Sequence, residues 1–273
     1  MEIFLHSGFY LYTSSTILRL LEEAYTKMLA VEIRDLHRFY GDYEALKGVS
    51  FEIKEGEIFG LIGPNGSGKT TTLRIIATIL KPSRGVVRVF GYDVVREADR
   101  VRKLISYLPE EADLYKRLTG VENLLFFAKM YGETSDEVKE MVKFGIEISG
   151  LGNRVYDKVE TYSKGMRRRL ALARTLMVKP KLAILDEPTS GLDVYASVNV
   201  RNSIKKFVKE TGGTVLLSSH NMLEVEYLCD RVAFINKGVI IAIGSPDELK
   251  RNYNASNLEE AFVRAVESEF EKT

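Results

Sequence analysis

The sequence predicts an α/β fold in which helices cover both faces of a mainly parallel sheet. Short apolar runs of strand length alternate along the chain with segments of helical periodicity. One such run, 58–62, leads into a glycine-rich loop and then into a helical segment. A second run, 182–185, ends in two adjacent carboxylates. Ligand sites of parallel sheets lie at the carboxyl ends of the strands, so both features belong at one edge of the sheet.

The individual elements follow from periodicity and from the glycines and prolines that bound them. Expected strands cover 29–36, 49–54, 57–63, 85–89, 105–108, 182–185, 214–218, 232–235 and 239–243. Expected helices cover 69–80, 121–148, 166–178, 195–210 and 221–228. The helical stretch 111–165 separates two sheet-forming halves, which predicts an inserted helical subdomain. We expect the main domain to span 29–249 and a C-terminal helical tail to span 250–273.

The first 28 residues differ from the rest, because strand and helix patterns begin only at Leu29. They lack the basic start, apolar core and small-residue cleavage site of a signal peptide, although 17–27 suit a short amphipathic helix. Within this N-terminal extension, 1–28, we expect Met28 to be the native start and residues 1–27 to be mis-assigned; a loosely held N-terminal arm is the alternative. An intact mass that includes residues 1–27, measured on protein from the natural source, contradicts this expectation.

The composition indicates a globular protein whose charges are balanced. The chain has 273 residues, of which 45% are hydrophobic and 28% charged, and its formal net charge is +1. Nucleic-acid binding usually leaves a basic footprint, so no nucleic-acid partner is expected. The single cysteine, Cys229, excludes an intramolecular disulfide and suits a reducing, cytoplasmic setting. No run reaches the roughly 20 apolar residues that cross a bilayer, so a partner must supply any membrane part.

The glycine-rich loop has the pattern G-x-x-x-x-G-K-[ST], which is typical of a phosphate-binding loop between a strand and a helix. Its residues are Gly63, Pro64, Asn65, Gly66, Ser67, Gly68, Lys69 and Thr70, and Thr71 follows in the helix. Glycines let backbone N–H groups approach phosphate oxygens, and the helix N-terminus adds partial positive charge. Lys69 can reach the outer phosphates, and the Thr70 hydroxyl can bind Mg²⁺. A plain glycine-rich turn before a core helix is the weaker alternative.

The base of the bound nucleotide is predicted to be adenine. GTPases share this loop but normally carry an Asn-Lys-x-Asp base reader. The stretch Asn236-Lys237-Gly238-Val239 lacks the aspartate and has the pattern of a turn. ATP is therefore favoured over GTP.

Three further side chains are candidates for hydrolysis. Asp186 and Glu187 follow the apolar run 182–185, where Asp186 can hold Mg²⁺ and Glu187 can polarise the attacking water. General-base assistance of this kind contributes about 10²–10⁴ in rate. His220 follows the expected strand 214–218 and is a candidate sensor of the γ-phosphate. Alone, each feature has a plain structural explanation; together with the phosphate loop they favour catalysis.

A third element makes the sequence resemble an ATP-binding cassette (ABC) ATPase from about Leu29 to Leu249. Its signature-like stretch is Tyr162-Ser163-Lys164-Gly165-Met166-Arg167-Arg168-Arg169. The other matching motifs are the aromatic Tyr40, a Q-loop at Tyr107-Leu108-Pro109-Glu110 and a D-loop at Ser190-Gly191-Leu192-Asp193. The resemblance implies an ABC-type P-loop NTPase fold, with an antiparallel β subdomain and a helical subdomain beside the parallel core. It also implies that Tyr40 stacks on adenine, Glu110 helps to hold Mg²⁺, and Asp193 lies near ATP.

Two positions depart from the family pattern. Glu110 stands where glutamine is usual and adds negative charge, and Met166 replaces a polar signature residue; the whole sequence contains no glutamine. The stretches 108–124 and 258–262 resemble the subgroup of drug-resistance and sodium-export ATPases. The resemblance therefore favours an exporter.

The resemblance implies a Mg²⁺-dependent ATPase that powers transport from the cytoplasmic face of the membrane. Ser163, Lys164, Gly165 and Met166 would complete the site of a second subunit, so two chains would close head-to-tail as a homodimer around two ATP molecules. An integral-membrane permease would dock on the helical subdomain and determine the substrate. A non-transport ABC ATPase acting on nucleic acid or the ribosome is one alternative, and a non-catalytic nucleotide-gated module is another.

Overall fold

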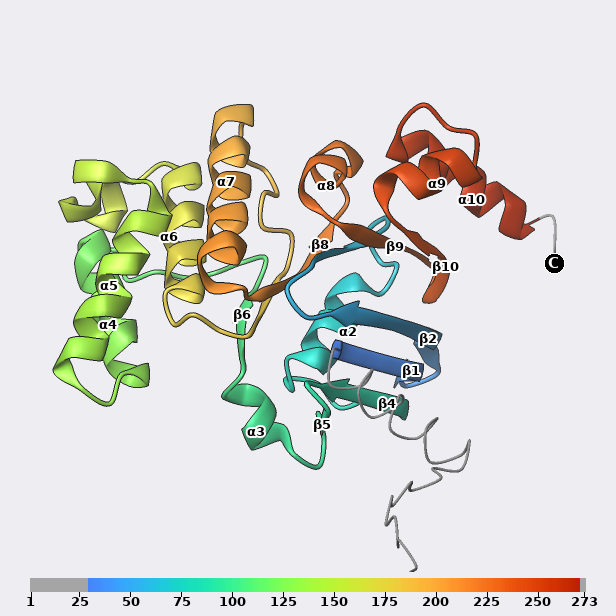
Figure 1. The fold of residues 1–273 in the computed structure, drawn as a ribbon, viewed down its shortest axis with the longest axis horizontal. Helices are drawn as coiled ribbons and strands as arrows, with labels where there is room; N and C mark the ends of the chain where they lie inside the picture. The colour runs from blue at the N-terminus through green and yellow to red at the C-terminus, as the bar shows by residue number, and fades with distance from the viewer. Residues whose placement is uncertain (1–28, 271–273) are drawn as a thin grey trace, which may run out of the picture.

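The computed structural model describes residues 29–270, which form two β-sheets with helices packed around them (Figure 1). Residues 1–28 and 271–273 lie outside the described residues, and with them the expected helix over 17–27 and the expected extension. Figure 1 shows α4, α5 and α6 at one end of the molecule and α9 and α10 at the other. Within 29–270, no helix combines the length and the apolar composition that a membrane span requires.

The larger sheet has six strands in the order β10-β9-β3-β8-β7-β6. Its strands are β3 (Ile58–Ile62), β6 (Ile105–Leu108), β7 (Leu182–Leu185), β8 (Thr214–Ser219), β9 (Arg231–Asn236) and β10 (Val239–Gly244). All neighbours are parallel except β10, which pairs antiparallel with β9. Every residue of β3, β7 and β8 is buried, as expected of strands covered on both faces. The predicted mainly parallel sheet is confirmed.

The smaller sheet is antiparallel, in the order β2-β1-β4-β5. Its strands are β1 (Leu29–Tyr40), β2 (Tyr43–Lys54), β4 (Arg84–Val89) and β5 (Tyr92–Asp93). The first two are longer than predicted because they pair with each other along their full length to the turn at Gly41. The two-residue strand β5 and the five-residue helix α3 (Ala98–Arg102) were not predicted, since neither is long enough to show a period.

The longer helices lie close to their predicted positions but differ at their ends. They are α2 (Lys69–Ile76), α4 (Gly120–Tyr131), α5 (Ser135–Ser149), α6 (Lys164–Leu176), α7 (Val194–Thr211), α8 (Met222–Leu228), α9 (Pro246–Asn252) and α10 (Leu258–Phe270). Helix α2 ends four residues earlier than predicted, and Thr78 beyond it has a left-handed backbone. The predicted helix 121–148 is two helices, because the chain leaves the helix at Gly132 and Thr134 opens a new capping box with Glu137. Two 3-10 turns, Gly152–Tyr156 and Val159–Thr161, precede α6.

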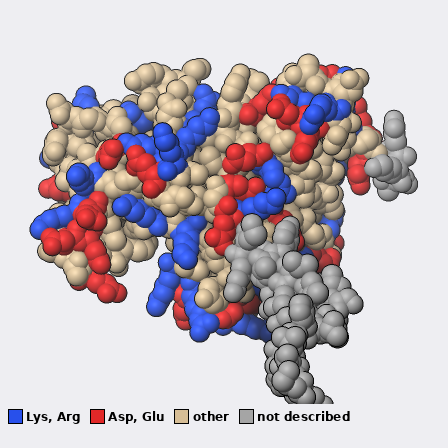
Figure 2. All heavy atoms as spheres, in the orientation of Figure 1, with Lys and Arg blue, Asp and Glu red and all other residues tan. Residues whose placement is uncertain are grey.

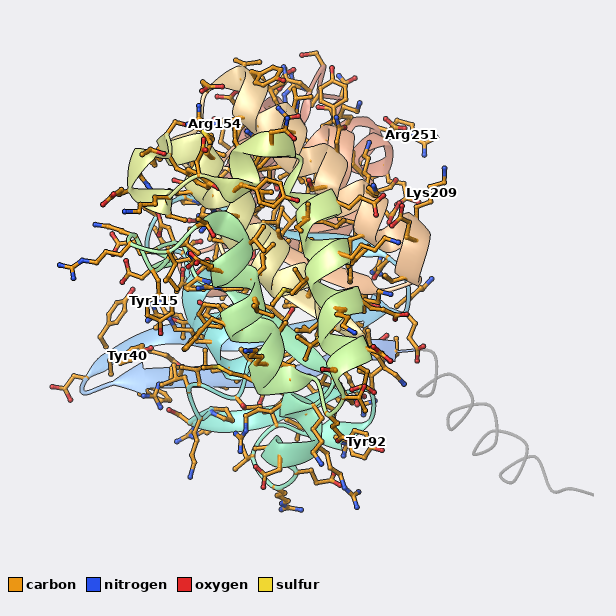
Figure 3. All side chains as sticks on the ribbon, turned by 90° about the vertical axis from the view of Figure 1, so that its left-hand side faces the viewer. Tyr40, Tyr92, Tyr115, Arg154, Lys209 and Arg251 are labelled. Atoms are coloured by element: carbon orange, nitrogen blue, oxygen red, sulfur yellow. The ribbon has the colours of Figure 1, made fainter. Side chains whose placement is uncertain are left out.

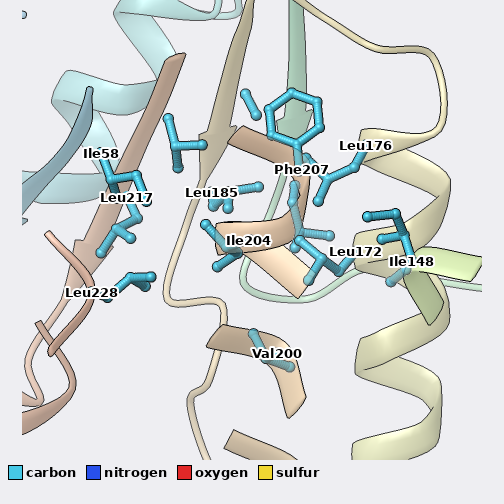
Figure 4. Close-up of a cluster of buried hydrophobic side chains, with 14 of the residues drawn as sticks. Ile58, Ile148, Leu172, Leu176, Leu185, Val200, Ile204, Phe207, Leu217 and Leu228 are labelled. Carbon is cyan, nitrogen blue, oxygen red and sulfur yellow. The ribbon is translucent and has the colours of Figure 1, made fainter. Parts of the chain in front are cut away.

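Two buried clusters hold the sheets and helices together. One lies between the larger sheet and the helices, where side chains of α6 and α7 interdigitate with those of β7 and β8 (Figure 4). Its centre includes Leu172, Leu176, Leu185, Val200, Ile204, Phe207 and Leu217. The other lies between the two sheets, where the rings of Phe51 and Phe59 stack 5.3 Å apart. Burial on both faces of β3, β7 and β8 therefore fixes the strand ends that carry the polar residues.

Candidate functional site

The loop between β3 and α2 closes on itself through Lys69. The Lys69 ammonium donates to the carbonyl oxygens of Gly63 at 2.7 Å and Pro64 at 3.2 Å. Gly66 (φ 78°) and Gly68 (φ 108°) have left-handed backbones that favour glycine. A Cβ on Gly68 would also lie 2.6 Å from Leu46 Cδ2. The sequence adopts this loop because glycine meets both demands, and the loop curls in front of the α2 N-terminus.

The Asp186 carboxylate is buried at the end of β7 and accepts three hydrogen bonds. Its Oδ1 accepts from Thr70 Oγ1 at 3.2 Å and from Ser218 Oγ at 2.6 Å, and its Oδ2 accepts from the Tyr107 hydroxyl at 3.2 Å. Burial, aided by Asp186, raises the pKa of Tyr107 to about 12, so this phenol keeps its proton as a donor. Side chains from α2, β6, β7 and β8 thus converge on one carboxylate.

Glu187 is buried beside Asp186 and lies between two basic side chains. Its Oε2 lies 2.8 Å from Nδ1 of His220, and its Oε1 lies 3.4 Å from Nζ of Lys69. The Glu187 backbone is left-handed (φ 47°), which is uncommon for a residue with a side chain and is found at functional sites. Its N–H donates to Ser218 Oγ at 2.9 Å.

Lys69, Thr70, Glu187 and His220 line an open cleft of about 610 Å³, and the buried Asp186 contacts Thr70 of its wall. Its walls are formed by Tyr40, Tyr43, Ala45, Asn65, Gly66, Gly68, Lys69, Thr70, Thr71, Glu110, Glu187, Ser190 and His220. Figure 3 shows Tyr40 near the outer end of the β1–β2 hairpin, and the Arg38 guanidinium lies 4.7 Å from its ring centre. The cleft therefore runs from an exposed aromatic ring to the phosphate-type loop and the carboxylates.

The structure does not bring the signature-like residues to this cleft. Ser163 caps the N-terminus of α6, where its hydroxyl accepts from the Met166 N–H at 3.2 Å. Asp193 caps α7 in the same way by accepting from the Ala196 N–H at 2.8 Å. Nine of the sequence-predicted residues are absent from the cleft walls: Gly63, Pro64, Ser67, Ser163, Lys164, Gly165, Met166, Asp186 and Asp193. The first three belong to the glycine-rich loop itself, and the buried Asp186 contacts Thr70 of the wall at 3.2 Å.

Sequence reasoning missed two kinds of residue. Tyr43 lines the cleft beside Tyr40, but an exposed tyrosine in a strand carries no distinctive pattern. Arg168 is buried on α6, and its guanidinium reaches the backbone of the carboxylate turn. The helical spacing of the buried residues of α6 would have placed Arg168 on the inward face of the helix. Nothing in the sequence predicts which carbonyl oxygens accept its hydrogen bonds.

The α/β fold and this cleft define a P-loop nucleoside-triphosphatase. The ABC transporter family model matches residues 46–190. The linearmycin resistance ATP-binding protein LnrL of Bacillus subtilis (strain 168) is 40% identical over 246 residues, covering 87% of this chain and 79% of that protein. The daunorubicin/doxorubicin resistance ATP-binding protein DrrA of Streptomyces peucetius is 39% identical over 229 residues, covering 84% and 69%.

A solved structure shares both fold and sequence with this chain. It is the dimeric post-hydrolysis state of the ATP-binding cassette MJ0796 bound to ADP and Pi, with a TM-score of 0.69 and 26% identity, covering 79% of this chain and 98% of that one. The chain belongs to the ABC transporter family and is an ATP-binding subunit of the ATPase type. The predicted family and its resemblance to drug-resistance ATP-binding proteins are confirmed, and a role on nucleic acid or the ribosome is not favoured.

Proposed function

We propose that this chain hydrolyses Mg·ATP in the cleft and thereby powers export through a separate membrane permease. The observation that carries the proposal is the convergence of Lys69, Asp186, Glu187 and His220 at the carboxyl ends of adjacent parallel strands. Export is favoured because the relatives LnrL and DrrA are named as resistance proteins.

The phosphate loop and Tyr40 hold the nucleotide in this proposal. Asn65, Gly66 and Gly68 line the cleft, where backbone N–H groups of the loop and the Lys69 ammonium would face the phosphates, and Thr71 extends this wall. The Ser67 hydroxyl is buried without a hydrogen-bond partner among residues 29–270, which suits a loop shaped for a polar ligand. Tyr40 is 45% exposed, with the Arg38 guanidinium 4.7 Å from its ring centre, and the exposed part of the ring would stack on adenine.

The donor set in the cleft fits Mg²⁺. Thr70 and Asp186 present hard oxygen atoms 3.2 Å apart, and Glu110 lines the same cleft. When bound, Mg²⁺ draws charge from the phosphate oxygens and neutralises charge that develops on them. Thr70, Asp186 and Glu110 are the residues proposed to hold it.

Glu187 is the proposed general base and His220 its partner. A water oxygen attacks the γ-phosphorus, the bond to the β-phosphate oxygen breaks, and the water proton passes to the Glu187 carboxylate. The left-handed backbone of Glu187 directs its side chain toward Lys69 and His220, away from the Asp186 carboxylate. Glu187 and Asp186 thereby keep separate roles, although they are neighbours in the chain.

A second subunit completes the site in this proposal. Ser163, Lys164, Gly165 and Met166 lie at the N-terminus of α6, and a helix end of this kind attracts anions, yet they do not line their own cleft. A head-to-tail pair would place this helix end and Asp193 at the partner's ATP. The related cassette MJ0796 is described as dimeric with ADP and Pi bound.

The membrane partner is proposed to dock on the helical subdomain, 111–165, which is inserted between β6 and β7 (Figure 1). The proposed layout also includes the main domain 29–249, an N-terminal extension 1–28 and a C-terminal tail 250–273. On the face seen in Figure 2, Lys and Arg interleave with Asp and Glu without a broad basic area, so a permease is favoured over nucleic acid. The subunit would then lie on the cytoplasmic side of the membrane, bound through its partner.

Two measurements test the proposal. Purified protein should turn over ATP steadily with Mg²⁺ and stop when the metal is chelated, whereas binding without turnover would favour a non-catalytic module. The Glu187→Gln variant should bind ATP, lose turnover by about 10²-fold or more, and shift from monomer to dimer with ATP in light scattering. A variant that binds ATP but stays monomeric would contradict the homodimer.

A further inference from the structure

Arg168 joins two turns of the cleft from behind. It lies on α6, is 8% exposed, and donates five hydrogen bonds to main-chain carbonyl oxygens. The acceptors are Pro109 (2.8 Å), Glu110 (2.9 Å), Asp186 (2.8 Å), Glu187 (2.9 Å) and Pro188 (2.9 Å). The first two follow β6 and the other three follow β7. One rigid, planar fork thus holds two segments that are far apart in the sequence.

The Glu187 peptide is held on both sides. Its N–H donates to Ser218 Oγ at 2.9 Å, and its carbonyl accepts from Arg168 Nη2 at 2.9 Å. A left-handed backbone (φ 47°) at a residue with a side chain is strained, and such strain persists only where the surroundings over-determine it. Arg168 and Ser218 are the surroundings that do so here.

Burial does not remove the charge of Arg168. Desolvation lowers its pKa to about 10, against the opposing effect of the carboxylates of Asp186, Glu110 and Glu187. The guanidinium is therefore cationic at neutral pH, and its hydrogen bonds to carbonyls are the stronger, charge-assisted kind.

We propose that Arg168 is a positioning residue for hydrolysis: it holds the strained backbone of Glu187, and so the direction of its carboxylate, and ties this turn to Glu110. This rests on the proposed role of Glu187 as the base. Because Arg168 is five residues from Ser163 on the same helix, the tie also links the carboxylate turn of one cleft to the helix end offered to the partner's cleft.

A lysine at 168 keeps the charge but lacks the fork, and a glutamine removes the charge and most donors. Arg168→Gln should lower kcat about 10–100-fold, since small misplacement of a catalytic group has effects of this size. The Kd for ATP should change less than about threefold, because Arg168 does not line the nucleotide cleft. The kcat of Arg168→Lys should lie between that of Arg168→Gln and that of the unchanged protein. Arg174→Gln is the matched control, since Arg174 lies on the same helix outside the signature-like stretch and the cleft walls, and donates to the single carbonyl of Asp113 at 2.7 Å.

The deciding measurement repeats Arg168→Gln in the Glu187→Gln background. A residue that acts through the Glu187 carboxylate should cause no further loss of the residual rate, because effects of residues that act as a unit are not additive. An equal fold-loss in both backgrounds, or a kcat for Arg168→Gln within about twofold of the unchanged protein, overturns the proposal.

The nucleotide-free protein gives an independent readout. Arg168→Gln, which loses five hydrogen bonds to carbonyls, should lower Tm by about 5–10 °C, and Arg174→Gln, which loses one, should lower it by less. If Arg168→Gln does not fold, the kinetic comparison is made with Arg168→Lys and has the same two outcomes. If the unchanged protein turns over no ATP, the proposed function fails. In that case an equal Tm for the two glutamine variants also overturns the proposal that Arg168 holds the Glu187 turn to Glu110.

Discussion

Nδ1 of His220 lies 2.8 Å from Oε2 of Glu187, although the two residues follow different strands. Their contact joins the turn after β8 to the turn after β7, so a histidine at the mouth of the cleft contacts a carboxylate buried within it. This contact supports the proposed roles, in which His220 orients Glu187 as the base and senses the γ-phosphate.

Replacing His220 should slow hydrolysis more than it weakens nucleotide binding. In His220→Ala the Glu187 carboxylate keeps Lys69 as its ionic partner but loses its orienting contact. We expect kcat to fall about 10–100-fold in steady-state ATP turnover. His37→Gln, at a histidine that does not line the cleft, should leave kcat unchanged; a comparable loss there would remove the special role of His220.

Tyr40 and Tyr43 should differ in their effect on ATP affinity. Both rings line the cleft and are exposed, and Tyr40 is the one that we propose to stack on adenine. Tyr40→Ala should raise the Kd for ATP about tenfold, because a lost stacking contact is worth about 1–3 kcal/mol, while Tyr40→Phe should retain affinity. The reverse order, with Tyr43→Ala the more damaging, would assign the base contact to Tyr43.

The Thr70 hydroxyl should determine the Mg²⁺ requirement. It is the side chain of α2 that contacts Asp186, and alanine removes this oxygen while serine keeps it. Thr70→Ala should raise the Mg²⁺ concentration for half-maximal turnover about tenfold or more, and Thr70→Ser should stay near the original value. If both variants titrate alike, the Mg²⁺ ligands lie elsewhere.

The cluster beneath α7 should dominate stability. Phe207 is fully buried beside the larger sheet (Figure 4), whereas Phe126 on α4 is 39% exposed. Phe207→Ala should lower the free energy of unfolding by about 3–5 kcal/mol through lost burial and a residual cavity. Phe126→Ala should lower it by less than about 1 kcal/mol. Urea unfolding of both variants measures the difference, and similar losses would place the main core elsewhere.

His37 should make stability depend on pH near neutrality. Its hydrogen bond to Glu44 at 2.7 Å and its contact with Asp35 raise its pKa above 6.5, against some desolvation. Because the pKa of His37 is raised in the folded state, protonation of His37 stabilises the folded protein. This stabilisation is fully present below pH 6.5 and is lost as the pH rises through the folded-state pKa. Tm should therefore gain on going from pH 8 to pH 6 by more than it does in His37→Gln. Parallel Tm profiles for the two proteins would show that the contact does not persist in solution.

The central strands and the phosphate-type loop could be predicted from the sequence because their signals are local. Strands covered on both faces appear as unbroken apolar runs, as at 182–185, which matches β7 at both ends. The loop at 63–70 needs glycine at left-handed positions, so its backbone conformation can be predicted from its residue types. The resemblance to ABC ATPases added candidate roles for single residues, which composition and hydrophobic periodicity cannot predict.

Elements whose ends depend on pairing or packing could not be predicted in detail. The hairpin of β1 and β2 extends beyond its apolar core because each strand satisfies the other's backbone. Helix α2 stops before its periodic pattern does, and Gly132 with Thr134 divides one predicted helix into two. Such boundaries reflect competition among turn, cap and tertiary contacts.

The sequence by itself determined the chemical inventory of this protein: a lysine and a threonine after a glycine loop, two carboxylates after one strand and a histidine after another. Only the tertiary structure decided how these groups meet. Glu187 contacts His220, 33 residues away, and its backbone is held by Ser218 and Arg168. No local pattern encodes such contacts, because the order of strands in the sheet, set by burial on both faces, determines which turns become neighbours.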